Sequence, residues 1–128
     1  MKAADLFENG VIYINGKEIN TVSDLQWINH PKFAGVLMKN LFCGKESNDN
    51  MSAMIVKIDP HHEIGTHVHE GKSELHEVIS GEGIAEVGDV QINYRPGVIS
   101  LIPSDLPHSV RAGDSGIVLL AKFTPPLN

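Results

Sequence analysis

The sequence predicts an all-β domain, either a sandwich or a barrel of short strands. Apolar segments rich in Val and Ile recur along the chain, and Gly, Pro, Asn and Asp separate them. Helical periodicity is weak, and no repeat or low-complexity linker divides the chain. With 128 residues, of which 41% are hydrophobic and 20% charged, the chain is expected to form a single domain with one core.

The first fifty residues are expected to extend this domain with further strands. Asn15-Gly16 readily adopts positive φ at both central positions of a type I′ turn, so it predicts a hairpin between two flanking strands. Residues 21–34 are the least β-like part, and residues 23–27 fit either one capped helical turn or a packed loop. The elements expected here are a hairpin at 11–14 and 17–19, a strand at 36–42 and a polar surface loop at 44–50.

Residues 51–128 are expected to form the barrel itself. Pro60 and Pro103 end two of its strands, because proline lacks the N–H that a central strand needs. Gly88-Asp89 is a two-residue hairpin pattern. The expected strands are 51–59, 66–69, 74–79, 84–87, 90–94, 98–102, 108–111 and 117–123.

Charge and composition argue against several classes of partner. The chain has 10 basic and 16 acidic residues, a net charge of −6, whereas nucleic acids and anionic membranes bind concentrated positive charge. No apolar run is long enough to cross a bilayer, and no signal peptide is recognisable at the N-terminus. Cys43 is the single cysteine, which excludes an internal disulfide and fits a reducing compartment. We therefore expect a cytoplasmic protein with no nucleic-acid or membrane partner.

Four potential metal ligands lie in two separate stretches of the sequence. On a strand, His67 and His69 would point to the same face, and residues 70–73 can reverse the chain and bring Glu74 beside them. His108, on a distant strand, would then close one side of an ion. Three imidazoles and one carboxylate suit a divalent transition metal such as zinc, iron, manganese, nickel or copper. Taken alone, the alternating histidine pair also fits two surface residues.

The two stretches resemble the paired motifs of the cupin superfamily. The first reads His67-x-His69-x4-Glu74-x6-Gly81, and the second reads Gly97-x5-Pro103-x4-His108. The resemblance covers residues 51–124 and includes all four ligand positions of the family.

Three positions depart from the family pattern. His61 and Asp105 stand where the motifs usually have glycine, and Ala112 stands where the second motif usually has asparagine. Aspartate tolerates the left-handed backbone conformation, so we expect the turn at Asp105 to be kept. The missing asparagine removes a structural hydrogen bond of the family and leaves the ligand set unchanged.

The resemblance implies a small jelly-roll barrel, or double-stranded β-helix, with one divalent metal ion at its mouth. The ion would be held by His67, His69, Glu74 and His108. Small relatives are often dimeric through N-terminal strands, so a homodimer is expected. The superfamily includes dioxygenases, isomerases, lyases, binding proteins and storage proteins, and the motifs therefore do not define the reaction.

Two functions remain open: a metal-dependent enzyme acting on a small oxygenated organic molecule, and a non-catalytic module that binds or senses a small ligand. For the enzyme, Glu74 and His76 are the candidate catalytic residues, because both should face the pocket and transfer protons. His76 equally fits a further metal ligand or a wall residue that orients Glu74 through a hydrogen bond. Trp27 is expected to fill a core or interface or to cover the pocket. Arg111 is expected to point away from the metal and Arg95 to lie in a turn, so neither arginine is expected to face the pocket.

Overall fold

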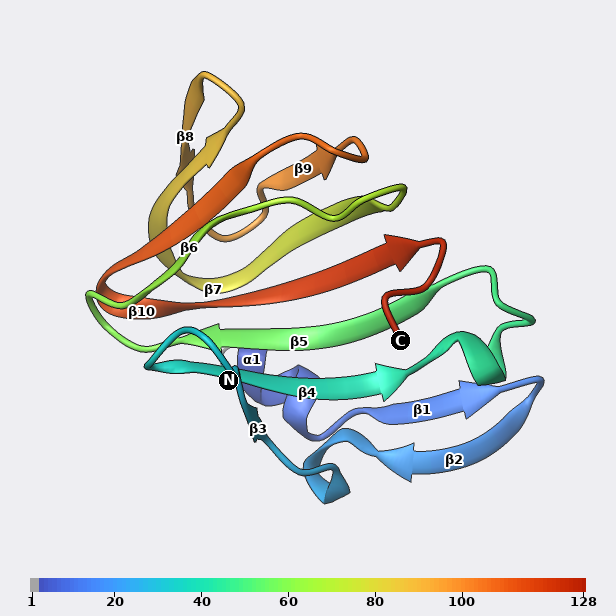
Figure 1. Cartoon of the computed structure of the whole chain (residues 1–128). Helices are drawn as coiled ribbons and strands as arrows, with labels where there is room; N and C mark the ends of the chain where they lie inside the picture. The colour runs from blue at the N-terminus through green and yellow to red at the C-terminus, as the bar shows by residue number, and fades with distance from the viewer. Residues whose placement is uncertain (1–2) are drawn as a thin grey trace.

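The computed structural model describes residues 3–128, which form an antiparallel jelly-roll barrel with one short helix (Figure 1). This arrangement confirms the predicted all-β class. The elements are α1 (Ala3–Glu8), β1 (Val11–Ile14), β2 (Lys17–Thr21), the 3₁₀ turn η1 (Val22–Asp24), β3 (Ile28–Asn29), β4 (Val36–Phe42), the 3₁₀ turn η2 (Gly44–Glu46), β5 (Ser52–Ile58), β6 (Glu63–His67), β7 (Ser73–Val87), β8 (Val90–Tyr94), β9 (Ile99–Ile102) and β10 (His108–Thr124). No helix within the described range is long and apolar enough to span a membrane.

One sheet runs through the whole barrel in the order β3-β4-β5-β10-β7-β8. Two further strands complete it, because β6 pairs with β10 and β9 pairs with β7. The C-terminal part of β10 pairs with β5 and the start of β7, while its N-terminal part pairs with β6 and the end of β7. The two long strands therefore hold both halves of the barrel together, and both are visibly bent in Figure 1.

The bends in β7 and β10 correct the predicted strand boundaries. The sequence analysis expected separate strands at 74–79 and 84–87, and again at 108–111 and 117–123. In the structure each pair is one continuous strand. Gly81 and Gly116 adopt positive φ at the bend, where the pairing register of β10 with β7 also shifts. A β-bulge of this kind turns the strand without ending it, which a local reading of glycine as a strand end misses.

Strand β6 is also displaced from its predicted position. It spans Glu63–His67 and not 66–69, so His69 lies just beyond the strand. The carbonyl of His69 accepts hydrogen bonds from the backbone N–H of Lys72 (3.3 Å) and of Asp105 (3.2 Å). These bonds hold His69 against the turns that contain Lys72 and Asp105, and not against a neighbouring strand.

The predictions for the N-terminal region are confirmed more closely. The β1–β2 hairpin turns at Asn15 and Gly16, whose φ angles of 53° and 77° suit a type I′ turn. Strand β4 has the predicted bounds. In the segment 23–27, which precedes β4, the structure has the 3₁₀ turn η1 without a side-chain cap, followed by irregular backbone. Because β4 pairs along β5, β3 and β4 of the proposed extension at 1–50 share one sheet with the proposed barrel at 51–128, whereas β1 and β2 form a two-stranded sheet of their own.

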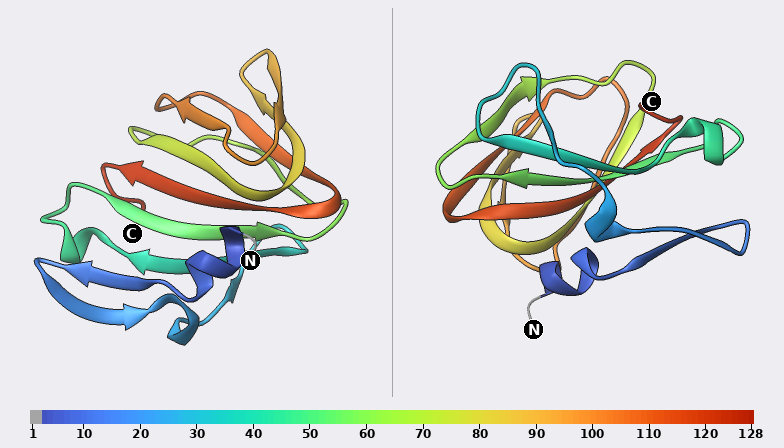
Figure 2. Two further views of the ribbon diagram at one scale, coloured as in Figure 1. Left: turned by 180° about the vertical axis from the view of Figure 1, so that it is seen from behind. Right: turned by 90° about the horizontal axis from the view of Figure 1, so that it is seen from below.

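The core lies inside the barrel, and a second apolar cluster lies outside it. Alternation along β5 sends Met54, Val56 and Ile58 inward, whereas Ile55 faces the outer side. Burying one such side chain contributes about 1.5–3 kcal/mol. Figure 2 shows α1 and the β1–β2 hairpin on the outer side of the sheet, where Trp27 packs with the second cluster.

A buried ion pair attaches the N-terminal segment to the sheet. Lys39 of β4 is 2% exposed, and its ammonium group donates to both carboxylate oxygens of Glu8 (3.0 and 3.1 Å) and to the carbonyl of Val22 (3.1 Å). The same ammonium lies 4.6 Å from the centre of the Trp27 ring. Trp27 therefore fills the interface between the segment and the outer face and lies away from the barrel mouth.

Candidate metal centre

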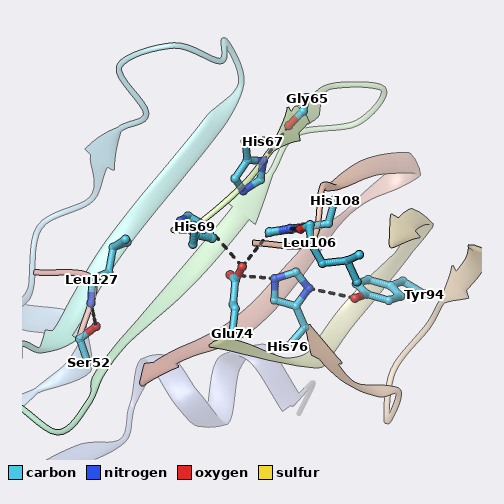
Figure 3. Close-up of polar contacts among 10 residues, drawn as sticks. All are labelled: Ser52, Gly65, His67, His69, Glu74, His76, Tyr94, Leu106, His108 and Leu127. Carbon is cyan, nitrogen blue, oxygen red and sulfur yellow. Dashed lines mark hydrogen bonds and ion pairs between the residues drawn. The ribbon is translucent and has the colours of Figure 1, made fainter. Parts of the chain in front are cut away.

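The structure brings together the four side chains that the sequence analysis proposed as ligands (Figure 3). His67 ends β6, His69 lies two residues beyond it, Glu74 is the second residue of β7 and His108 begins β10. One potential ligand atom from each of the four lies within 4.8 Å of all the others. The pairing of His108 with His67 in the β10–β6 ladder creates this proximity between residues far apart in the sequence. Their role as ligands of an ion stays a prediction.

The histidine ring orientations are set by backbone carbonyls. Nδ1 of His67 lies 2.7 Å from the carbonyl oxygen of Gly65, and Nδ1 of His108 lies 2.8 Å from that of Leu106. A carbonyl can only accept, so each Nδ1 carries a proton and donates it. This leaves Nε2 as the nitrogen that can bind a metal, which is the arrangement expected around a histidine ligand.

Glu74 lies at the centre of the cluster and is 6% exposed. Its Oε1 is 3.0 Å from Nε2 of His108 and 3.5 Å from Nε2 of His69. Burial alone would raise the pKa of Glu74, but hydrogen bonds from His108, His69 and His76 hold that pKa well below its usual range. The group is therefore a carboxylate, the form that binds a cation.

Two of the histidines respond to the cluster in opposite ways. Burial is the largest influence on His67 and lowers its pKa. Burial also disfavours protonation of His108, but its hydrogen bonds to Glu74 and to the Leu106 carbonyl raise its pKa above the ordinary value. A metal ion needs the Nε2 lone pair of His108, so binding must displace the proton that this nitrogen shares with Glu74.

His76 contacts the second carboxylate oxygen of Glu74, and its ring centre lies 6.2 Å from that of His108 (Figure 3). Its Nε2 donates to Oε2 of Glu74 at 2.8 Å, and the hydroxyl of Tyr94 lies 2.9 Å from its Nδ1. His76 and Tyr94 are 4% and 1% exposed. These contacts are those of the wall residue considered in the sequence analysis, while a catalytic role for His76 stays a prediction.

Two aromatic residues that the sequence analysis did not assign to the site border the cluster. Phe33, from the loop between β3 and β4, has its ring centre 6.4 Å from that of His67. Phe123 of β10 lies edge-on to His69 with ring centres 5.0 Å apart. Tyr94 was missed as well. Only the folding of distant segments identifies them, because an isolated aromatic at a strand end or in a loop has no distinguishing pattern.

The two arginines of the chain lie outside the candidate metal centre. Arg95 and Arg111 are both exposed, and Arg111 pairs with Glu63 at 4.0 Å. The expectation that neither arginine faces the cluster is confirmed.

The departures from the motif are also explained, because His61 and Asp105 adopt φ angles of 62° and 67° where glycine is usual. The predicted turn at Asp105 is therefore kept, and its carboxylate accepts from the N–H of Gly71 at 3.1 Å.

The fold is a small jelly-roll barrel, and the His/Glu cluster is a candidate metal centre. These two features place the protein among the small β-barrel proteins with a candidate metal site. The sequence model of the cupin domain matches residues 54–121, more than half of the chain. The chain belongs to the cupin domain family. This establishes the family that the motif resemblance implied.

Solved structures support the same fold. The chain resembles KdgF from Halomonas sp. (TM-score 0.70, 20% identity, 80% of this chain and 88% of that chain covered). It also resembles a predicted oxalate decarboxylase from Thermotoga maritima, with a TM-score of 0.76 and 19% identity over 88% of this chain and 98% of that chain. An RmlC-like cupin from Shewanella frigidimarina has a TM-score of 0.70 and 21% identity over 80% of this chain and 86% of that chain. At these identities the likeness shows the fold alone. No functionally curated protein matches the chain.

Proposed function

We propose that this protein is a metal-dependent enzyme that acts on a small oxygenated organic molecule. His67, His69, Glu74 and His108 would hold one divalent transition-metal ion, with zinc, iron, manganese, nickel and copper as the candidates. The observation that carries the proposal is the convergence of these four donors within 4.8 Å of one another. The two carbonyl-anchored histidines support it, since Nε2 of each is directed away from its carbonyl partner.

The ion would supply Lewis-acid or oxygen-activating chemistry to a substrate with adjacent oxygen atoms. The chain's own residues would prepare the site for it. Glu74 carries the negative charge that favours a cation, and its partner His76 is the candidate for holding a proton beside it. Phe33 and Phe123 form apolar walls that limit access of water. Dioxygenase, isomerase and lyase reactions all fit this arrangement.

One observation favours the second candidate, a non-catalytic module that binds or senses a small ligand. Both ring nitrogens of His76 are engaged, one by Glu74 and one by Tyr94. His76 therefore offers no free nitrogen to a substrate in this arrangement. In this alternative the ion would bind the ligand without changing it.

The two functions are separated by a test on protein purified without an affinity tag. Metal analysis should find a transition metal bound, and Co²⁺-substituted protein should change its visible spectrum when a substrate binds. Oxalate is a suitable first probe because one structural neighbour is described as a predicted oxalate decarboxylase. Turnover that a chelator abolishes would support the enzyme. A compound that changes the spectrum and is recovered unaltered would support the binding module.

Metal affinity should fall as the pH is lowered. The pKa of His108 is raised, so the metal-free protein keeps its Nε2 proton to a higher pH than an ordinary histidine does. Below that pKa the ion must compete with the proton, and affinity should drop about tenfold per pH unit for each proton displaced. Competition titrations with a chromogenic chelator between about pH 5.5 and pH 8 measure this dependence. A flat profile would contradict the assignment of His108 as a ligand.

We also propose that the protein is a cytoplasmic homodimer. An exposed apolar face extends from α1 across the outer side of the barrel. Phe7 borders two hollows on this face, one of about 330 Å³ under the hairpin and one of about 340 Å³ beside β9. Tyr13 of the hairpin is 63% exposed, and Leu101 of β9 is 68% exposed. A two-stranded hairpin is marginally stable by itself, so a second copy packed on this face would support it. The lone thiol of Cys43 fits a reducing compartment.

Charges placed on this face should separate the dimer. We expect the double variant Tyr13→Asp/Leu101→Asp to elute as a monomer in light-scattering chromatography, while the unaltered protein elutes as a dimer. Val90→Asp is the matched control, because Val90 is also exposed (59%) but lies on β8, remote from the hairpin (Figure 1). A monomeric unaltered protein, or a dimeric double variant, would exclude this interface.

A further inference from the structure

The two oxygens of the Glu74 carboxylate have separate partners. Oε1 faces the candidate metal centre, 3.0 Å from Nε2 of His108 and 3.5 Å from Nε2 of His69. Oε2 faces the other way and accepts a hydrogen bond from Nε2 of His76 at 2.8 Å. Figure 3 shows separate contacts from this carboxylate to His76, His108 and His69, and the ring centre of His76 lies 6.2 Å from that of His108. The Glu74 carboxylate thus connects His76 to the imidazoles of the candidate metal centre.

His76 itself has little freedom to move. Its second ring nitrogen, Nδ1, is 2.9 Å from the hydroxyl of Tyr94, and the two rings are nearly perpendicular with centres 5.8 Å apart. Tyr94 is 1% exposed and makes a further hydrogen bond to Ser100. On the backbone, His76 pairs with Ser100 of β9 on one side and with Ala121 of β10 on the other. The imidazole ring of His76 is therefore held by its side-chain contacts, and its backbone is held between two neighbouring strands.

The carboxylate oxygen that it contacts distinguishes His76 from His69 and His108. His67, His69, Glu74 and His108 form the group whose ligand atoms converge, and His76 is not a member of it. Its Nε2 donates to Oε2, whereas His69 and His108 of the group contact Oε1. These contacts do not fit His76 as a fifth ligand.

We propose that His76, held by Tyr94, is a positioning residue that restricts Glu74 to binding the ion through Oε1 alone. This inference rests on the proposed metal function. A carboxylate can bind a cation through one oxygen or through both, and a hydrogen bond that occupies Oε2 prevents the second mode. The ion then has four protein donors, and its remaining positions stay open to exchangeable ligands such as water or substrate.

Co²⁺-loaded protein tests this proposal, because the visible absorption of Co²⁺ weakens when its coordination number rises. In the His76→Phe variant the freed Oε2 should join Oε1 on the ion, and the absorption should fall. Affinity for Co²⁺ should fall by about 10- to 100-fold as well, since the carboxylate loses the partner that orients it. His76→Gln keeps an N–H in a similar place and should restore the spectrum of the unaltered protein.

Two further variants separate positioning from general disruption of the barrel. Tyr94→Phe removes the hydroxyl that holds His76 and should shift the spectrum in the same direction as His76→Phe, but less. Glu77→Gln is the matched control, because Glu77 follows His76 on the same strand, pairs with Lys122 at 2.6 Å on the outer face and should change neither spectrum nor affinity. Thermal melting of each metal-free variant verifies that it folds.

The outcomes distinguish this inference from the proposed function on which it rests. Unaltered protein that takes up no Co²⁺ would overturn both. Unaltered protein that binds Co²⁺, together with His76→Phe and Tyr94→Phe variants of unchanged spectrum, would overturn the positioning role and leave the metal centre intact. If His76→Phe fails to fold, the comparison of His76→Gln and Tyr94→Phe with the unaltered protein decides the question.

Discussion

Replacing His69 with alanine should lower the affinity for a divalent metal by more than about 100-fold, beyond the loss expected for a residue that only orients a ligand. The remaining donors, His67, Glu74 and His108, would leave one side of the ion unprotected. The barrel should stay folded, because His69 lies just beyond the end of β6 and does not belong to the apolar core cluster. Metal analysis after dialysis and chelator competition measure the loss, and circular dichroism verifies the fold.

His61→Ala is the matched control for this substitution. His61 precedes the same strand, but its side chain is 62% exposed and meets only Asp114 in a surface ion pair at 3.1 Å. Its removal should leave metal content unchanged. Full metal occupancy in the His69→Ala variant would refute the proposed ligand set, whereas loss of metal in both variants would indicate a general effect of removing histidines.

Replacing Glu8 with alanine should destabilise the fold by about 2–3 kcal/mol, because it leaves the ammonium of Lys39 buried without its counter-ion. Lys39 is 2% exposed, so its ammonium group depends on the two contacts from Glu8. The Val22 carbonyl and the Trp27 ring remain as partners and reduce the cost. For a domain of this size the midpoint of thermal unfolding should fall by roughly 10 °C.

The opposite substitution should be milder. In Lys39→Met the partner left behind is Glu8, which is 36% exposed and can regain water, so we expect a loss of about 1 kcal/mol. The double variant Glu8→Leu/Lys39→Met should recover most of the stability lost in Glu8→Ala, because an apolar pair needs no desolvation of charges. Urea unfolding of the three variants measures these differences. Equal losses in Glu8→Ala and Lys39→Met would contradict the explanation from burial.

Much of the fold could be predicted from local sequence. The bounds of β4 and β8 follow from short apolar runs, and the β1–β2 hairpin follows from Asn15-Gly16. Local patterns failed at the bends of β7 and β10, since a glycine that ends a strand and a glycine that bends one look alike in sequence. Only the register of pairing with the neighbouring strand separates the two cases.

The candidate ligand set was also predictable, because its members stand at characteristic spacings and have side chains suited to transition metals. What those residues touch was not. The position of His76 two residues after Glu74 fitted an acid, a ligand or a wall residue equally well, and alternation along a strand gives only the face. The hydrogen bond from His76 to the outward oxygen of Glu74 favours one of these roles.

By itself, the sequence determined the all-β class, the cupin motifs and the four donors that can hold an ion. The tertiary structure decided which side chains surround those donors: Tyr94 from β8, Phe33 from a loop near the N-terminus and Phe123 from the last strand. The physical reason is that strand periodicity and turn preference are properties of neighbours along the chain. Contacts between residues far apart depend on the closure of the barrel, which brings both ends of β10 against strands from each half of the sequence.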